Sequence, residues 1–527
     1  MATTTFVHPT IGRLRGVPGK GLSQFLGVQY ASLKDRLAVP EEILDYGGGE
    51  IYVNKLGPQA LSSPTGCDFE HSLIQQSLPH SEFEISDRNC LHLNVTVPNG
   101  AKNLPVMVFI HGGGFAGGSV SWPQYDQARL VEVSITMGKP IIGVSVNYRL
   151  GVPGFLTSEE LRKAGYKTNN GIRDQKVALQ WVKRNIEGFG GNPNLVTIAG
   201  QSAGAVTSML LLQSPELLFQ QLISMGGTPM LLPHLPRVVS EGVYSTIAAA
   251  QNVDKLSAEE RVNYILNCPM EELCSKLPPG LPLIPVVDDD LVKALPTYKQ
   301  TLKYGPTEML PGMTWCKRLL IGDCQFDGSI YKGALDTHLP NLGKRFHEFL
   351  KESLAGYPLD VSTLEEAYGI NPDSPDDVVT RNILQWATDI GFSLPAKVTC
   401  QTWLGESYLY HFNEKNPWDG FGKGEATHIF DVALLFMNFE DHLSPAQRAR
   451  ASFFIEDVLQ FVNADAPFPS YQSEHNGARV YGPVSARFVT SNNAEDFGRR
   501  STIQQLEKHV GFDAMNRVLG DFLSKKW

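Results

Sequence analysis

The segment that decides the fold is residues 195–204, Leu-Val-Thr-Ile-Ala-Gly-Gln-Ser-Ala-Gly, followed by the mostly apolar run 205–213. Residues 195–199 are too few for a helix and predict a buried strand, whereas the next run is long enough for a helix. A G-x-S-x-G between a strand and a helix is typical of a nucleophile elbow, whose sharp turn lifts the serine hydroxyl clear of the sheet. Ser202 is therefore the candidate nucleophile.

A second glycine motif lies upstream, directly after another apolar run. Residues 104–110 (LPVMVFI) predict a strand, and residues 111–115 (HGGGF) follow at once. Such a segment supplies backbone N–H groups to an oxyanion hole, because glycines let the main chain approach a developing negative charge. We expect Gly113, Gly114 and Ala203 to be the donors.

The order of elements predicts an α/β fold with a mostly parallel sheet flanked by helices. Short apolar runs at 104–110, 140–146 and 195–199 resemble buried parallel strands, and residues 174–186 repeat their apolar positions at helical spacing, as a crossover helix does. We interpret residues 1–527 as one domain with a covering insertion at about 229–315, where Pro-rich turns separate short helical pieces. Strands return at 318–321 and 408–412, a helix begins at Ser444-Pro445 and runs to 462, and the tail is predicted to be helical.

Composition and charge exclude several classes of protein. Lys and Arg total 45 against 55 Asp and Glu, a net charge of −10, with no run of five or six basic residues, so a nucleic-acid partner is not expected. No stretch of 18 apolar residues predicts a membrane span, and residues 1–10 have neither the basic nor the apolar part of a signal peptide. We therefore expect a cytoplasmic protein, or a secreted one if the start of the chain is trimmed.

Seven cysteines without a CxxC pair argue against a zinc site, and the odd count leaves at least one thiol free. The residues leave two readings open, thiols in a reducing compartment or two disulfides closing short loops. The Asn94-Val95-Thr96 sequon lies in a predicted strand, where a glycan does not fit, which favours the first reading.

The chain resembles the type-B carboxylesterase/lipase family, the cholinesterase-like branch of the α/β-hydrolases, nearly from end to end. The resemblance implies a triad of Ser, an acid and then His. The block IGDCQFDGS (321–329) then carries the acid onto Asp327, with Asp323 as the competitor, interpreted as a loop or cap residue. GEATHIFD (424–431) carries the base onto His428. The other matching blocks are FLGVQYA (25–31), CLHLNV (90–95), NYRLG (147–151), NGIRDQ (170–175) and FGGNP (189–193).

Three departures from the family pattern bear on the pocket. Asp327 replaces the usual Glu and is one methylene shorter, Gln201 replaces the usual Glu before the nucleophile, and residues 225–228 (MGGT) replace an S-G-S-like segment. By resemblance alone, Cys67 is expected to pair with Cys90, and Cys268 with Cys274.

We expect a serine carboxylic-ester hydrolase that forms an acyl-enzyme and acts on small or medium soluble esters, with no metal or organic cofactor. Two alternatives stay open: triad-dependent acyl transfer, lactonisation or related carbonyl chemistry, and a non-catalytic binding protein on the same fold. The resemblance also disfavours choline esters, because residues 68–89, where the cholinesterases keep a Trp that binds the quaternary ammonium group, contain no Trp. Trp122 and Phe115 are either pocket residues or ordinary packing, and the sequence does not indicate an oligomeric state.

Overall fold

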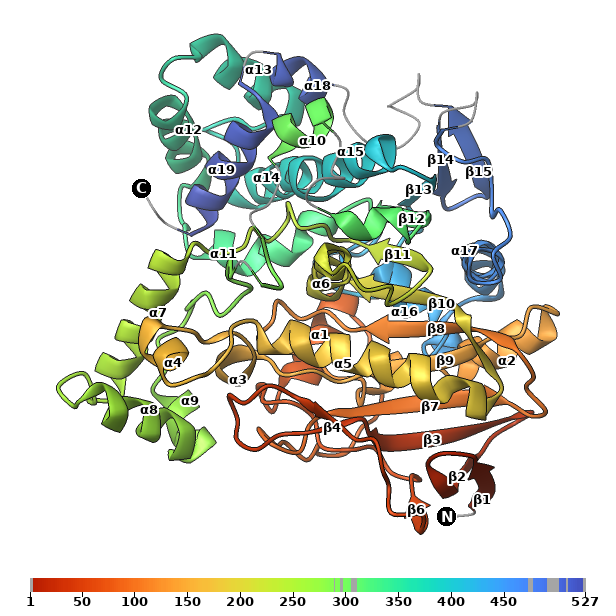
Figure 1. Ribbon diagram of the computed structural model, residues 1–527. Helices are drawn as coiled ribbons and strands as arrows, with labels where there is room; N and C mark the ends of the chain where they lie inside the picture. The colour runs from red at the N-terminus through yellow and green to blue at the C-terminus, as the bar shows by residue number, and fades with distance from the viewer. Residues whose placement is uncertain are drawn as a thin grey trace.

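One sheet runs through the computed structural model, which describes residues 3–288, 290–293, 297–304, 310–472, 477–490, 502–508 and 510–524. The sheet has 13 strands in the order β1-β2-β3-β7-β9-β8-β10-β11-β12-β13-β14-β15, with β6 beside β2 (Figure 1). The seven strands from β9 to β14 along this order are parallel. The strands at both ends of the sheet pair antiparallel, except that β6 runs parallel to β2. The predicted α/β class is therefore confirmed.

The strands are β1 (Thr4–His8), β2 (Gly12–Pro18), β3 (Leu22–Gln29), β6 (Glu50–Tyr52), β7 (His92–Pro98), β8 (Leu104–Ile110), β9 (Ile142–Val146), β10 (Gly191–Gln201), β11 (Gln221–Met225), β12 (Arg318–Cys324), β13 (Glu406–Phe412), β14 (Gly477–Tyr481) and β15 (Ala486–Thr490), and a separate pair, β4 (Ala31–Ser32) and β5 (Glu41–Glu42).

The α-helices are α1 (Gly66–Ile74), α2 (Ala128–Thr136), α3 (Gly151–Phe155), α4 (Glu159–Lys163), α5 (Asn170–Asn185), α6 (Ala203–Leu210), α7 (Arg237–Ala250), α8 (Ala258–Asn267), α9 (Met270–Ser275), α10 (Tyr298–Tyr304), α11 (Lys332–Asp336), α12 (Leu342–Ser353), α13 (Pro358–Tyr368), α14 (Asp376–Thr388), α15 (Leu394–Thr402), α16 (Phe430–Leu435), α17 (Pro445–Val462), α18 (Thr502–Glu507) and α19 (Phe512–Leu523). Short 3₁₀ turns are η1 (Pro123–Tyr125), η2 (Ile186–Phe189), η3 (Leu211–Gln213), η4 (Pro311–Thr314), η5 (Asp327–Tyr331) and η7 (Glu440–His442), and η6 (Asp389–Ser393) is a π-helical turn.

The central strands are buried on both faces, as their continuous apolar sequence predicts. Successive side chains of a strand point to opposite faces, so Val106 and Val108 of β8 enter one core, and Met107 and Phe109 enter another. Trp181 of α5 belongs to the first core, and α17 contributes its apolar stripe to the second. The sheet is thus a middle layer between helices, with α5 on one side and α17 on the other (Figure 1).

A buried ion pair joins two of the sequence blocks quoted above, NYRLG (147–151) and NGIRDQ (170–175). Arg149 donates from Nη2 to Asp174 Oδ1 at 2.7 Å and from Nε to Asp174 Oδ2 at 2.8 Å, and its Nη1 also bonds the carbonyl oxygens of Arg36 and Ala38. Such a bidentate pair is geometrically specific. Two residues beyond Arg149, the Gly151 N–H bonds the Phe115 carbonyl at 2.8 Å, so this anchor also supports the HGGGF loop.

The predicted elements recur with small shifts at their ends. Strands are found at each predicted run, and the helix after Ser444 has a capping box with Gln447. The expectation of a purely helical tail is wrong, because β14 and β15 form an antiparallel hairpin before α18 and α19. β14 extends the parallel sheet next to β13. These residues form a strand because they pair with the backbone of β13.

In the described part of the segment at about 229–315, short helices alternate with turns, as the sequence predicts. Helices α7, α8 and α9 pack with α4 around a small separate core that includes Tyr244, Ile247 and Leu273. Whether the chain is one domain stays a prediction. No helix within the described ranges is long and apolar enough to cross a bilayer.

The disulfides implied by the family resemblance are absent, since all seven cysteines, each in a described segment, are free thiols. The Cys67 thiol donates to Gln124 Oε1 at 3.7 Å, and the Cys274 thiol contacts Met270 Sδ at 3.8 Å. Both expected pairs are therefore corrected to free thiols, because each of these sulfur atoms has another neighbour.

Candidate active site

The nucleophile elbow joins β10 to α6 at Ser202. Its backbone has φ 53° and ψ −122°, a positive φ that non-glycine residues rarely adopt and that stores strain. The Ser202 N–H bonds the Met225 carbonyl at 2.9 Å, which fixes the turn. A Cβ atom on Gly204 would lie 2.2 Å from the Ile110 carbonyl oxygen, and one on Gly200 would lie 2.4 Å from the Gly204 oxygen. The two glycines of the motif are therefore required by close backbone contact.

The predicted oxyanion donors lie on two neighbouring segments. Gly113 and Gly114 have φ values of 100° and 60°, and both are exposed to solvent. A Cβ atom on Gly113 would lie 2.2 Å from the Gly117 carbonyl oxygen. Ala203 is the first residue of α6, so its N–H has no acceptor within the helix. Among the described residues, these three N–H groups have no hydrogen-bond acceptor, so they are available to an incoming oxyanion.

The predicted acid and base are joined in the structure. Asp327 begins η5, shortly after β12 ends, and its side chain is completely buried. Its Oδ1 accepts a hydrogen bond from His428 Nδ1 at 2.7 Å, and its Oδ2 accepts one from the Cys324 N–H at 2.7 Å. Burial raises the pKa of the Asp327 carboxyl, and its bonds to His428 and to the Cys324 N–H oppose that rise. The shorter acid thus reaches the imidazole.

The loops that carry the acid and the base are bonded directly to each other. The Phe326 N–H donates to the Ala426 carbonyl at 2.8 Å, and Phe326 forms an isolated parallel bridge with Thr427. The His428 N–H donates to Ser329 Oγ at 3.2 Å. The pairing of these loops orients the imidazole from both its backbone and its Nδ1 side.

Asp323 takes no part in this pair, and its interpretation as a loop or cap residue is wrong. It lies in β12 opposite His411 of β13 and accepts a hydrogen bond from His411 Nδ1 at 2.5 Å. Both side chains are buried. The structure therefore separates the two candidate acids, because each has its own histidine.

Ser202 and His428, which both lie in described segments, are not hydrogen-bonded to each other. Instead, His428 Nε2 faces the side-chain amide of Gln201, with 3.1 Å between the two nitrogen atoms. The consecutive residues Gly226 and Gly227 lie beside both residues. A Cβ atom on Gly226 would lie 3.3 Å from His428 Cε1, and one on Gly227 would lie 2.5 Å from the backbone carbonyl oxygen of Ser202. Catalytic hydrogen bonds are often formed only with substrate bound.

A buried carboxyl near the base, Glu70 of α1, was missed by sequence reasoning. Gln124 Nε2 donates to Glu70 Oε1 at 2.7 Å, and Tyr125 and His428 lie near enough to affect its titration. Burial raises the pKa of Glu70 to about 7. No pattern in residues 66–74 distinguishes Glu70 from an exposed helical acid, because its burial depends on the loops that pack over it.

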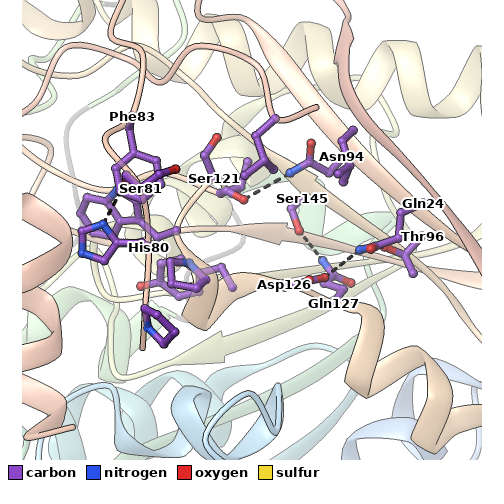
Figure 2. A pocket seen from close by; sticks show the side chains of 17 residues that line it. Gln24, His80, Ser81, Phe83, Asn94, Thr96, Ser121, Asp126, Gln127 and Ser145 are labelled. Carbon is purple, nitrogen blue, oxygen red and sulfur yellow. Dashed lines mark hydrogen bonds between the residues drawn. The ribbon is translucent and has the colours of Figure 1, made fainter. Parts of the chain in front are cut away.

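Two cavities lie near these residues. The first, of about 340 Å³, is lined by Trp122, Tyr125, His80 and Phe83 among others, and Figure 2 shows the Gln24–Asp126 and Gln127–Ser145 contacts on one of its sides. The second, of about 1120 Å³, is lined by residues of the segment 229–298, by α19 and by Tyr331, the last residue of η5. Trp122 therefore lines a cavity, whereas Phe115 is buried and packs against Phe155 with 4.9 Å between ring centroids.

Among the residues that the structure describes, one group has metal-ligand character: Cys67, His71 and His80. His80 bonds Asp68 Oδ1 at 3.0 Å through Nε2 and the Ser81 carbonyl at 3.1 Å through Nδ1, so both its nitrogens are engaged. The Cys67 thiol donates to Gln124. Hydrogen bonds thus account for this group, and we assign no metal to it.

Comparison with known proteins identifies the family of the chain. The sequence pattern of the carboxylesterase family matches residues 3–478. The chain belongs to the carboxylesterase family. Lipase 3 of Yarrowia lipolytica is 31% identical over 462 residues, which are 83% of this chain and 85% of the lipase.

Other relatives match over shorter stretches. Lipase 4 of Diutina rugosa is 39% identical over 211 residues, 39% of this chain and 34% of that lipase. The para-nitrobenzyl esterase of Bacillus subtilis is 36% identical over 231 residues, 43% of this chain and 44% of the esterase. The chain thus spans about a third to less than half the length of these two relatives.

Solved structures agree with the fold of this carboxylesterase-family chain. A thermophilic PNB esterase superposes with a TM-score of 0.73 at 20% identity, covering 95% of this chain and 99% of that one. A second PNB esterase gives a TM-score of 0.70 at 21% identity, covering 95% of this chain and 99% of that one. The fold is that of an α/β-hydrolase.

Proposed function

We propose that the protein is a serine carboxylic-ester hydrolase whose triad is Ser202, Asp327 and His428. The observation that carries this proposal is the buried Asp327–His428 pair, with 2.7 Å between Oδ1 and Nδ1, at the same sheet edge as the strained Ser202 elbow. The names of the relatives, which are lipases and esterases, support the same class of reaction.

The bond to Asp327 leaves the proton of the neutral imidazole on Nδ1 and its lone pair on Nε2. In the acylation step, Ser202 Oγ attacks the ester carbonyl and its proton passes to His428 Nε2. Asp327 holds the ring in this tautomer and stabilises the imidazolium. The leaving alcohol then takes the proton from Nε2, which leaves an acyl group on Ser202.

Deacylation repeats the same proton transfers with water as the nucleophile. In both steps the negative oxygen is bound by the N–H groups of Gly113, Gly114 and Ala203. Removing one such donor in similar sites lowers kcat by roughly 10²–10³. The residues in this account need no metal ion or organic cofactor.

We propose small or medium soluble esters as substrates, held in the 1120 Å³ cavity beside η5. That size exceeds the roughly 300–1,000 Å³ typical of small-molecule sites, which leaves room for an apolar acyl chain or alcohol. The predicted insertion supplies much of the lining. The apolar lining includes Met230, Leu231, Leu232 and Ile284 of that insertion and Leu519 of α19.

A variant that narrows the 1120 Å³ cavity tests whether this cavity holds the substrate. Leu231→Trp is expected to lower kcat/KM for hexanoyl and longer aryl esters more than for the acetyl ester, because the indole takes the space of the acyl chain. Leu56→Trp narrows the smaller cavity of Figure 2 and serves as the matched control. Equal effects of both variants on the chain-length profile would contradict the assignment.

The nucleophile is tested by Ser202→Ala on a short-chain aryl ester. We expect kcat to fall by about 10⁴ or more, as for removal of a triad nucleophile. Circular dichroism shows whether the variant folds. A folded variant that keeps most of its activity would contradict the triad.

We also propose that the protein works in a reducing compartment, consistent with a cytoplasmic location. Its seven cysteines are free, and the Asn94 side chain is engaged inside β7 with the Gly27 N–H at 2.9 Å and the Val120 carbonyl at 3.2 Å. Thiol titration of protein from its natural source should give seven free thiols under denaturing conditions. Three or five thiols would indicate disulfides.

A further inference from the structure

The side-chain amide of Gln201 is hydrogen-bonded to Nε2 of His428, the nitrogen that has to act as the base. Because Nδ1 donates to Asp327, Nε2 carries the lone pair, and Gln201 Nε2 lies 3.1 Å from it. Only an N–H of the amide bonds a lone pair favourably, which assigns the NH₂ group to this contact. In the resting enzyme, the acceptor for the Ser202 proton is therefore already bonded.

The Gln201 backbone is fixed by the sheet, and its side chain is enclosed beside His428. Gln201 is 1% exposed, and its backbone is fixed in β10 opposite Met225 of β11. A Cβ atom on Gly112 would lie 2.2 Å from Gln201 Oε1, so the amide oxygen rests directly on the backbone of the HGGGF loop. The amide thus lies between that loop and the base.

The other groups that face His428 come from three elements. Asp327 of η5 bonds Nδ1, Asp431 of α16 acts on the ring through space, and so does Glu70 of α1. Tyr410 Oη donates to Asp431 at 2.7 Å, and Gln124 bonds Glu70. Phe392 of η6 lies with its ring centroid 5.4 Å from that of His428. Within the described residues, Gln201 alone hydrogen-bonds Nε2.

We propose that Gln201 is a positioning residue whose N–H favours neutral His428 at rest, and whose amide turns so that its oxygen accepts a hydrogen bond from the Nε2–H of the imidazolium during turnover. The inference rests on the proposed function. Nε2 has a single lone pair, so a half-turn of the amide has to free it before the Ser202 proton arrives. The same half-turn places Oε1 beside the new N–H of the imidazolium. An amide serves both protonation states in this way, whereas a carboxylate at the same place only accepts and favours the imidazolium.

The proposal makes a graded prediction for two variants of position 201. Gln201→Met removes the N–H bond that favours the neutral ring, so His428 should become protonated at a somewhat higher pH than in the wild type. Gln201→Glu adds a negative charge next to Nε2, and an opposite charge at this distance shifts titration by roughly 1–3 pH units. The pH at which His428 becomes protonated should therefore be highest in Gln201→Glu, lower in Gln201→Met and lowest in the wild type.

The shift is measured by NMR titration of the His428 ring, assigned by its loss in His428→Gln, together with the acid limb of kcat/KM on an aryl ester. NMR does not depend on turnover, so it tests Gln201 even if Ser202→Ala disproves the hydrolase. We expect both readouts to move upward by about one unit or more in Gln201→Glu and by less in Gln201→Met. Titration curves that coincide with the wild type in either folded variant would overturn the proposal.

Discussion

Asp323 and Asp327 lie four residues apart and are both buried, yet they bond different histidines. Asp323 lies within β12, so its partner is the cross-strand residue His411. Asp327 lies beyond the strand, where the chain turns toward the loop of His428. Position relative to the strand end therefore decides which carboxylate serves the base.

A pair of isosteric variants tests this distinction. We expect Asp327→Asn to lower kcat by roughly 10⁴, because the amide favours the wrong imidazole tautomer. Asp323→Asn should keep kcat within about tenfold and lower the melting temperature, because it breaks a buried hydrogen-bonded pair. Steady-state kinetics and calorimetry measure the two effects. A larger loss of kcat in Asp323→Asn would reverse the assignment.

Burial of Glu70 should make the free energy of unfolding depend on pH. Its pKa is about 7 in the folded protein and about 4.3 in an unfolded chain, so the folded state binds the proton more tightly between these values. The free energy of unfolding should therefore fall as pH rises from about 4.5 to 7 and level off above. Glu70→Gln should remove this fall. The unfolding free energy of the variant minus that of the wild type should therefore be about 2–3 kcal/mol larger at pH 8 than at pH 5.

Melting temperatures of Glu70→Gln and wild type across this pH range provide the measurement. Glu82→Gln is the matched control, since Glu82 is exposed on the loop that follows α1. A Glu70→Gln difference that is the same at pH 5 and pH 8 would contradict the buried titration.

At the level of residues, the sequence predicts the side chains that carry a motif and misses those that act by tertiary contact. Asp327 and His428 were placed by family blocks, and they meet as expected. The contact of Gln201 with His428, and the burial of Glu70, depend on packing between β10, α1 and the loop of His428. Neither has a local periodicity that would reveal it.

The first helix has an unexpected role as a support for the base loop. Gln75, just after α1, accepts a hydrogen bond from the Gly422 N–H at 2.6 Å and donates to the Trp418 carbonyl at 3.2 Å. Asn416 donates to the Ile74 carbonyl at 2.9 Å. Residues some 340 positions apart thus form one unit, and that unit contains His428.

Gln75→Ala should loosen this unit. We expect kcat to fall roughly three- to thirtyfold with little change in KM, because two hydrogen bonds at about 1 kcal/mol each orient the loop of the base. Gln76→Ala is the control, because, within the part of the chain that the structure describes, the Gln76 amide bonds only the neighbouring Ser77 carbonyl. Steady-state kinetics compare the two; a Gln75→Ala enzyme indistinguishable from Gln76→Ala would disprove the support.

Elements with continuous apolar sequence were predictable, and those formed by pairing at an edge were not. β8 and β9 read directly as buried strands, and α5 as their crossover helix. β14 and β15 alternate only weakly over five residues each, and they become strands because β13 offers a parallel edge. The sequence of β14 and β15 alone does not show that β13 is available to pair with them.

At the scale of the molecule, the sheet explains how distant residues meet. β10, β11, β12 and β13 are adjacent and parallel, so the segments that follow β10, β12 and β13 leave the sheet at one edge. Ser202, Asp327 and His428 each lie in one of these segments. The order of the strands thus gathers a site from residues 202 to 428, and the helices beyond β12 in Figure 1 cover this end of the sheet.

The central claim is that one serine forms a covalent ester with the acyl group of the substrate. Wild-type protein is mixed with an activated aryl ester, quenched in acid within milliseconds and mapped by peptide mass spectrometry. We predict one acyl group per chain, on Ser202, and no adduct in Ser202→Ala. Acyl groups on another residue, or turnover without any adduct under conditions that trap the acyl-enzyme of a known serine esterase, would contradict the account.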